Sequence, residues 1–230
     1  RGLGDVYKRQ SLKFQLYEMP EEKVLISGLM ERIGVGNSFY TIKVNGEKIK
    51  KEVELNNHEE AFETLVKELE ENNVVESLDE IEGIGHRVVQ GGDYFDKTVV
   101  IDDEVLAKID ELSSLAPLHN PAAVTGIKAA KDVFPNAVQT AVFDTAFHQT
   151  MPKENFLYAL PISWYTDLKV RRYGAHGTSH KFVSQRMNEI LKRDDTKIIT
   201  CHIGNGASVS AVLNGKCVNT SMGLTPNAGL

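Results

Sequence analysis

An arginine inside an apolar stretch is the first residue whose type and setting could do chemistry. Arg87 lies in the segment GHRVVQGG (residues 85–92), where valines follow it and two glycines end the run. Burying a charge is costly unless an opposite charge meets it, and a planar guanidinium matches a carboxylate or a phosphoryl group. The segment therefore indicates an anion-binding arginine, although pairing with an internal Asp or Glu would also explain it.

Two further candidates lie at the ends of predicted elements. His119, in APLHNP (116–121), lies between two predicted helices, near a helix amino terminus whose N–H groups attract anions. A capping or packing histidine is the alternative there. Asp144, in VFDTAFHQTMP (142–152), follows a predicted strand at its carboxyl end, where open α/β folds collect ligands. Its carboxylate could orient an attacking oxygen or hold Mg²⁺ through water, or it could simply cap a helix.

The densest group of polar residues is RRYGAHGTSH (171–180). His176 stands beside Gly177 at the start of a predicted helix, where loop N–H groups and an imidazolium could stabilise one anion. A zinc hydrolase using His176, His180 and His202 is an alternative. However, no Glu separates His176 from His180, and a glycine fits a metalloprotease helix poorly. We therefore expect an anion-stabilising histidine.

A glycine-rich turn, HIGNGAS (202–208), joins two predicted strands. Such a turn allows backbone N–H groups to approach phosphate oxygens closely. Its spacing is not that of a Walker loop, and no helix follows it as in a dinucleotide fold. An ordinary hairpin turn is the alternative.

The elements that must position these residues follow from the spacing of apolar side chains. Alternation predicts strands at 11–16, 23–30, 38–44, 81–89, 138–143, 197–202, 207–213 and 216–220. Helical spacing predicts helices at 57–72, 104–112 and 121–133, and one that starts at Thr178 or Ser179. The apolar face of this last helix consists of Phe182, Val183, Met187, Ile190 and Leu191. We expect an α/β protein of mixed sheets flanked by helices, with domains at 1–150 and 151–230.

Composition limits the classes of function. The 230 residues are 41% hydrophobic and 25% charged, which is typical of a globular protein. A net charge of -6 disfavours nucleic-acid and anionic-membrane partners. Because the sequence has no run long enough to span a membrane and no signal-peptide pattern, we expect a cytoplasmic protein. Cys201 and Cys217 lie in apolar stretches and are expected to be buried thiols.

Taken in order, the segments GHRVVQGG, LHNP, VFDTAFHQTMP, RRYGAHGTSH, HIGNGAS and MGLTP resemble the acetate kinase family across essentially all of residues 11–230. The resemblance implies the two-domain ribonuclease H-like fold of the actin and sugar kinase superfamily, with the second domain truncated, and a homodimer. It also implies direct in-line transfer of the γ-phosphoryl group of ATP to acetate with Mg²⁺, which gives ADP and acetyl phosphate.

The resemblance also implies roles for individual residues. Asp144 would be the proton donor or acceptor, His176 would stabilise the transition state, and Arg87 would bind the acetate carboxylate. Substrate-binding positions would include Val89, Leu118, His119 and Ala175, and His180 would support them. Nucleotide-binding positions would be Ser11, Lys13, His202, Ile203, Gly204, Asn205 and Gly206. No metal ligand is expected within this sequence. Ala175 replaces a usual Phe, which suggests room for propionate.

The first ten residues, RGLGDVYKRQ, depart from the family. The family begins with an apolar strand and an Asn-x-Gly-Ser-Ser-Ser turn, a turn occupied here by Val6, Tyr7, Lys8 and Arg9. We interpret these ten residues as non-native. Since family residues expected after Leu230 are absent, we also expect the 230 residues alone to be inactive. The rival functions are a propionate or butyrate kinase and a non-catalytic actin-like ATP-binding protein.

Overall fold

The computed structural model describes residues 1–8 and 10–229, and the side chains of 1–4 and 10–229. The chain forms two compact units. The first comprises residues 1–88, 99–113 and 117–141, and the second comprises residues 89–98, 114–116 and 142–230. One boundary between the units lies between residues 141 and 142, inside a strand. The domain boundary expected after residue 150 stays a prediction.

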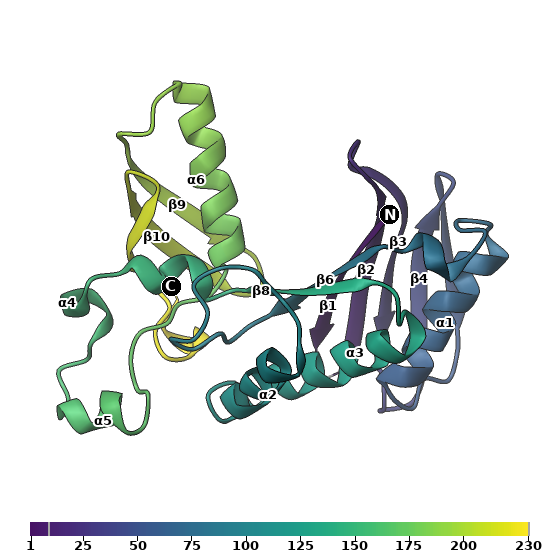
Figure 1. The fold of residues 1–230 in the computed structure, drawn as a ribbon, viewed down its shortest axis with the longest axis horizontal. Coiled ribbons are helices and arrows are strands. Elements are labelled where there is room, and N and C mark those ends of the chain that lie inside the picture. Colours follow the sequence, from purple (N-terminus) through teal and green to yellow (C-terminus); the bar gives the residue numbers. More distant parts are fainter. Residues whose placement is uncertain (9, 230) are drawn as a thin grey trace. The chain divides into compact units, whose positions relative to one another are not determined.

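An eight-stranded sheet forms the framework of the first unit (Figure 1). Its order is β5 (Glu47–Glu52), β4 (Phe39–Val44), β3 (Lys23–Glu31), β2 (Ser11–Glu18), β1 (Gly2–Lys8), β6 (Gly83–Val88), β8 (Val138–Phe143) and β7 (Val99–Val100). Strand β1 runs antiparallel to β2 and parallel to β6, so the sheet is mixed as expected. Asn45 and Gly46, with φ of 51° and 82°, make the predicted tight turn between β4 and β5.

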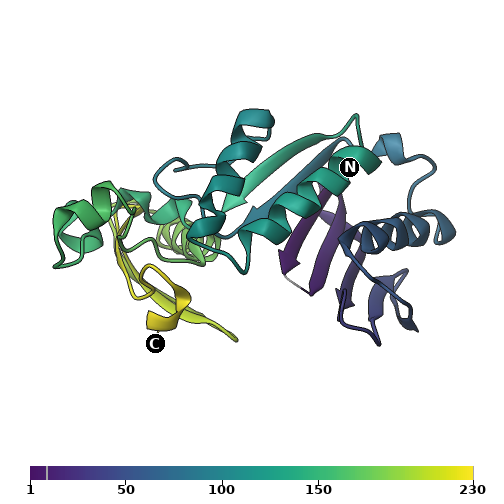
Figure 2. The same cartoon turned by 90° about the horizontal axis from the view of Figure 1, so that it is seen from below.

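Helices pack on this sheet through apolar side chains. They are α1 (His58–Glu71) and α3 (Asn120–Val133), whereas α2 (Asp103–Glu111) contacts α3. Short 3₁₀ turns lie at Leu78–Glu80 and Leu112–Ser114. Phe62 of α1 meets Phe134, just after α3, edge to face with ring centroids 6.4 Å apart. Both helices lie along the sheet in Figure 2. The N-cap of α1 is Asn57, whose side chain accepts from the Glu60 N–H at 2.9 Å.

One charged cluster is buried in the first unit. Glu68 is only 1% exposed, and its carboxylate accepts hydrogen bonds from the Tyr40 hydroxyl and, at 2.7 Å, from Lys51 Nζ. Burial raises the pKa of Glu68, but the bonds from Lys51 and Tyr40 outweigh burial and hold it below its usual value. Burial, together with the Glu68 carboxylate, raises the pKa of Tyr40 to about 12. The carboxylate therefore stays charged inside the unit.

The second unit contains a three-stranded antiparallel sheet. Its order is β11 (Lys216–Thr220), β10 (Ala207–Leu213) and β9 (Lys197–Ile203), and helix α6 (Gly177–Leu191) contacts β9. The shorter helices are η3 (Ala146–Thr150), α4 (Lys153–Phe156), α5 (Ile162–Thr166) and η4 (Pro226–Ala228). None of the helices described is long and apolar enough to cross a membrane.

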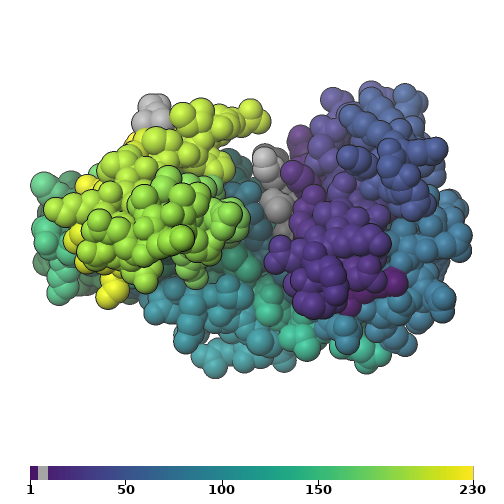
Figure 3. Space-filling model, turned by 90° about the horizontal axis from the view of Figure 1, so that it is seen from above, coloured from purple at the N-terminus to yellow at the C-terminus, as the bar shows by residue number. Residues whose placement is uncertain are grey.

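The burial of α6 is the reverse of what its apolar spacing suggests. Its buried side chains are polar or small, namely Gly177, His180, Ser184 and Asn188, whereas the predicted apolar face is exposed. Phe182 is 68% exposed and Ile190 is 62% exposed. Cys201 lies on β9 between the exposed Ile199 and Ile203, so the prediction that it is buried is wrong. Cys217 is buried as expected. The yellow-green surface in Figure 3 belongs to this part of the chain.

The amino terminus also differs from the expectation. Residues 2–8 form β1 in the middle of the large sheet, so Val6, Tyr7 and Lys8 belong to a strand and do not form a turn. Arg9 lies outside the described residues. Strand β1 was not predicted because GLGDVYK lacks a clean alternation of apolar and polar residues. Pairing with β2 and β6 on both sides overrides that weak local preference.

Candidate active site

Asp144 is the first element of a polar cluster within the second unit. It directly follows the last residue of β8 and is 2% exposed. The carboxyl end of a strand is where open α/β folds collect ligands. The Asp144 carbonyl accepts from the Gly177 N–H at 2.8 Å, and its Oδ2 accepts from the His176 N–H at 3.3 Å. Next to it, the Thr145 hydroxyl accepts from the Gly91 N–H at 2.9 Å. The carboxylate and the backbone carbonyl of Asp144 are therefore held against the start of α6.

The start of α6 is shaped by a close approach to Asp144. A Cβ added to Gly177 would lie 2.3 Å from the Asp144 carbonyl oxygen, so only glycine fits. Just before it, His176 adopts the left-handed conformation, with φ of 59°, and its side chain makes no capping bond. A non-glycine residue in this region is uncommon and tends to mark a functional position. The backbone thus directs the imidazole away from the helix and toward the sheet.

His176 makes its side-chain contacts with the small sheet. Its Nδ1 is 2.8 Å from Ser208 Oγ on β10, and its ring stacks on that of His202, with centroids 4.0 Å apart. His202 Nδ1 is in turn 2.9 Å from Ser179 Oγ. These contacts fix the plane of the His176 ring, as a group that must stabilise developing charge requires.

The glycine-rich turn adjoins the same imidazole. A Cβ added to Gly206 would lie 3.4 Å from Nε2 of His176, so the absence of a side chain brings turn and ring together. The Gly204 N–H donates to the Gly206 carbonyl at 3.1 Å and closes the turn, and Gly204 and Asn205 are exposed. Such an open turn beside an imidazole fits an anion better than it fits a neutral ligand.

Two further histidines lie behind this edge. His180 is 1% exposed, with Nδ1 at 2.7 Å from Thr200 Oγ1 and Nε2 at 2.8 Å from Ser208 Oγ. Burial, reinforced by the neighbouring histidines, lowers the pKa of His180 to about 4, so the ring is neutral near pH 7. His148 is fully buried, between Cys217 Sγ at 3.1 Å and the Ala175 carbonyl at 2.9 Å. Burial lowers its pKa and raises that of the Cys217 thiol to about 12.

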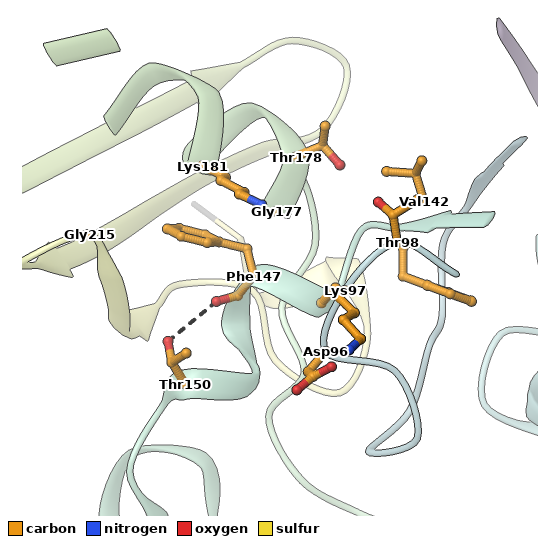
Figure 4. Close-up of a pocket in the computed structure, with 12 residues that line it drawn as sticks. Asp96, Lys97, Thr98, Val142, Phe147, Thr150, Gly177, Thr178, Lys181 and Gly215 are labelled. Atoms are coloured by element: carbon orange, nitrogen blue, oxygen red, sulfur yellow. Dashed lines mark hydrogen bonds between the residues drawn. The ribbon is translucent and has the colours of Figure 1, made fainter. Parts of the chain in front are cut away.

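A small cavity of about 220 Å³ lies beside this cluster (Figure 4). It is lined by the end of β8, by η3 and by the start of α6, where Gly177, Thr178 and Lys181 face it. Lys97 and Asp96 come from the loop before β7, and Thr150 donates to the Phe147 carbonyl at its rim at 3.4 Å. None of the predicted site residues lines it. The cavity is thus a neighbour of the cluster and not its centre.

The structure brings together only part of the predicted site. Within the second unit, Asp144, His176, His180, His202 and Gly206 are connected by the contacts above, with Ile203, Gly204 and Asn205 in the same turn. Ala175 is 6% exposed and Val89 is half-buried in this unit. The remaining predicted residues, Ser11, Lys13, Arg87, Leu118 and His119, belong to the first unit. Their place in a shared site stays a prediction.

Two residues of the cluster were missed by the sequence analysis. Ser208 and His148 occur inside the recognised segments, but nothing in their spacing singled them out. The one available signal for Ser208 was its place on a strand in which Ser208 and Ser210, two apart, share a face. Both serines are 0% exposed, and a strand that buries hydroxyls must satisfy them with hydrogen bonds.

The zinc alternative is not supported by this geometry. Across residues 1–8 and 10–229, no group of three or more His, Cys, Asp or Glu side chains could hold a metal ion. Ring nitrogens of the three histidines are instead bonded to hydroxyls: Nδ1 of His176 and Nε2 of His180 share that of Ser208, Nδ1 of His180 bonds Thr200, and Nδ1 of His202 bonds Ser179. The cluster is a hydrogen-bonded network of polar groups.

Comparison with known proteins agrees with these features. The model of the acetokinase family matches residues 9–230. Acetate kinases from Macrococcus caseolyticus and Bacillus mycoides are 55% and 57% identical over 96% of the chain. Each match covers 56% of the relative, so the chain spans little more than half the length of these proteins.

Solved structures give the same result. Porphyromonas gingivalis acetate kinase matches 98% of the chain and 58% of its own length, with a TM-score of 0.93 and 44% identity. A propionate kinase from Francisella tularensis, with the same identity and coverage, has a TM-score of 0.92. The acetate kinase of Entamoeba histolytica, 32% identical, has a TM-score of 0.85, with 100% of this chain and 56% of that one matched. The predicted mixed α/β fold of the actin and sugar kinase type is thereby confirmed, and the chain belongs to the acetokinase family.

Proposed function

We propose that this chain is the amino-terminal part of an acetate kinase, which transfers the γ-phosphoryl group of ATP to acetate. The observation that carries the proposal is the cluster in which Asp144, His176 and the turn at Gly206 meet. Membership of the acetokinase family supports it. The acceptor is a carboxyl group, and the products are acetyl phosphate and ADP.

The transfer is a direct in-line displacement. An oxygen of acetate attacks the γ-phosphorus, a new P–O bond forms, and the bond to the oxygen that bridges to the β-phosphorus breaks, so its electron pair leaves with ADP. The protein does little covalent work in such a step and mainly aligns groups and offsets charge. His176 donates a hydrogen bond to the transferred phosphoryl group, and the turn at 204–206 holds the phosphates of the nucleotide.

Arg87 and Asp144 complete the proposed machinery. The guanidinium of Arg87 pairs with the acetate carboxylate and offsets the repulsion between acetate and ATP. Asp144, fixed by the N–H of His176, orients the reacting groups and acts as the proton donor or acceptor. Ser11 and Lys13 would lie near the nucleotide, and Val89, Leu118, His119 and Ala175 around the substrate.

Mg²⁺ is the metal we propose to accompany ATP. Magnesium usually keeps several waters and binds through substrate phosphates, as a metal that accompanies ATP would. When bound, it supplies neutralisation of phosphate charge. We also propose a homodimer and a cytoplasmic location, for which the support is the family assignment and the sequence composition.

Substitution of Arg87 in the complete enzyme tests the proposal. Arg87→Ala should raise the KM for acetate about 10- to 100-fold, because a charge-assisted bond is lost, and should leave the KM for ATP nearly unchanged. Arg87→Lys is the matched control, since it keeps the charge but loses the two-pronged geometry. Its KM for acetate should lie between those of the wild type and Arg87→Ala. A coupled assay of ADP formation measures both. Unchanged acetate saturation in Arg87→Ala, or no acetate-dependent ADP release by the wild type, would refute the proposal.

A propionate kinase is the second candidate. It is consistent with the buried Ala175, where the family usually has Phe, and with the similarity to the Francisella tularensis propionate kinase. Ala175→Phe should then lower kcat/KM for propionate relative to acetate by filling the space beside the methyl group, by about tenfold for one methylene. An unchanged ratio of the two substrates would exclude this reading.

A further inference from the structure

The hydroxyl of Ser208 connects two imidazoles of the proposed site. Ser208 is 0% exposed, and its Oγ is 2.8 Å from Nδ1 of His176 and 2.8 Å from Nε2 of His180. A serine hydroxyl carries a single hydrogen and two lone pairs. It can therefore donate to only one of the two rings, and the other ring must donate an N–H to it.

The Thr200 hydroxyl, at the far end of this row of hydrogen bonds, bears on which group donates in each bond. If the Thr200 hydroxyl donates to the Ser210 carbonyl, 3.4 Å away, it accepts from the Nδ1–H of His180 at 2.7 Å. A neutral imidazole has one N–H, and burial keeps His180 neutral near pH 7 by lowering its pKa. Its Nε2 is then a lone pair that accepts the hydrogen of Ser208.

The remaining bond follows by elimination. Since the hydrogen of Ser208 points to His180, its oxygen can only accept from His176, and Nδ1 of His176 must be the protonated nitrogen. The opposite direction would take the hydrogen of Thr200 away from the Ser210 carbonyl. The first direction pairs the Thr200 hydroxyl with both the Ser210 carbonyl and Nδ1 of His180.

We propose that Ser208, held by His180 and Thr200, is a positioning residue that keeps a proton on Nδ1 of His176. The Nε2 edge of the ring then faces Gly206, whose added Cβ would lie 3.4 Å from that nitrogen. This inference rests on the proposed function, because Nε2 is thereby the nitrogen that gains a proton and donates it in a hydrogen bond to the transferred phosphoryl group. Stacking on His202 at 4.0 Å keeps the ring from turning.

The tautomer of His176 tests the proposal directly. Nitrogen-15 NMR of the full chain labelled at histidine, with the His176 signals assigned by His176→Gln, should show Nδ1–H with bare Nε2 above pH 7. Ser208→Ala should shift the ring toward Nε2–H. Ser210→Ala is the matched control, because it removes an equally buried hydroxyl from the same strand face, one that bonds Thr220, and should leave His176 unchanged.

Kinetics of the complete enzyme then separate positioning from packing. Ser208→Ala should lower kcat by up to about 100-fold through misplacement of His176, with little change in either KM, whereas Ser210→Ala should not. Ser208→Thr, which keeps the hydroxyl, should restore the wild-type tautomer. A wild-type Nε2–H tautomer, the same tautomer in Ser208→Ala, or an altered tautomer with unchanged kcat would overturn the proposal.

The wild-type tautomer requires no substitution at Ser208, and His176→Gln serves only to assign the signals, so a Ser208 variant that fails to fold leaves the proposal open to refutation. If the complete protein lacked acetate-dependent transfer, the proposed function would fail. The tautomer would still decide whether Ser208 sets the proton of His176.

Discussion

The two compact units bury different kinds of side chain. The core of the first consists mainly of apolar residues from the large sheet, α1 and α3, such as Leu12, Phe14 and Phe62. The second unit buries a hydrogen-bonded group of His180, Thr200, Ser208 and Ser210 beside its apolar residues. Contacts between apolar side chains do not depend on bond direction or on protonation, whereas the hydrogen bonds of such a network depend on both. The first unit should therefore respond to lost volume, and the second to lost protons or hydroxyls.

The largest effect should come from truncating the core of the first unit. Phe62→Ala removes a ring that is 0% exposed and stacks edge to face on Phe134, and should lower the free energy of unfolding by about 3–5 kcal/mol. Phe182→Ala in the second unit is the control, because that ring is 68% exposed and its loss should cost less than about 0.5 kcal/mol. Urea denaturation followed by circular dichroism measures both. Equal losses would contradict the comparison.

Acid should act on the second unit first. The folded-state pKa of His180, about 4, lies below the value of about 6.5 for an exposed histidine, so the unfolded chain takes up the proton first. Its contribution to stability is complete above pH ~6.5 and is lost as the pH falls to ~4, by up to about 3 kcal/mol. Glu68 has a lowered pKa too, so its contribution in the first unit is lost only below about pH 4.3.

Hydrogen exchange measured peptide by peptide resolves the order of the two losses. Between pH 6.5 and 4, peptides of α6 and β9 should lose protection before those of α1. Fluorescence of the single tryptophan, Trp164, which lies in the second unit, should change over the same interval. Earlier loss of protection in α1 would show that the buried histidines do not govern the acid response.

The buried carboxylate of Glu68 in the first unit gives a middle-sized effect. Glu68→Gln should cost about 2 kcal/mol, because the charge-assisted bonds from Lys51 and Tyr40 weaken while the shape is kept. Glu71 lies 4.0 Å from the same Lys51 and is half-exposed, so Glu71→Gln is a matched control that should change stability by less than about 0.5 kcal/mol. Thermal unfolding at pH 7 measures the pair. If Glu68→Gln left the free energy of unfolding unchanged, the cost of burying the carboxylate would cancel the gain from its ion pair.

The smallest effect concerns the ends of two helices. Helix α1 is followed by Asn73, whose backbone is in the left-handed region, and asparagine tolerates this conformation. Helix α6 instead ends on a lysine in that region, Lys192, with φ of 53°. Lys192→Gly should therefore stabilise the second unit by about 1 kcal/mol. The same change inside α6, Lys181→Gly, should destabilise it by about as much. Chemical denaturation of both variants measures the two changes in the free energy of unfolding. Changes of the same sign would contradict this prediction.

Prediction from sequence succeeded for strands with one buried face. Phe14 and Leu16 alternate with polar residues on β2, and this spacing alone gave the strand. The same reasoning failed for α6, where Phe182 and Ile190 are exposed, and for Cys201, because periodicity identifies an apolar face but not whether anything covers it. Strand β1 was missed because its pairing partners, and not its own residues, determine it.

The candidate site was predictable only as far as local segments allowed. Asp144 at a strand end and His176 beside Gly177 could be identified from the sequence, since strand ends and helix starts have local signals. Ser208 could not be connected to His176, which is 32 residues away, because a hydrogen bond between distant segments leaves no trace in spacing. The left-handed backbone of His176 was likewise invisible, as it is imposed by the contact of Gly177 with Asp144.

The lack of room at Gly177 has a consequence for any library of variants made in this protein. Some glycines are needed for their backbone angle alone: Gly46 and Gly215 have positive φ and nothing within 4 Å of an added Cβ, so asparagine could replace them. At Gly177 even a methyl group would collide with the Asp144 carbonyl. Saturation mutagenesis should therefore return functional clones with asparagine at the two turn positions and wild-type codons alone at position 177.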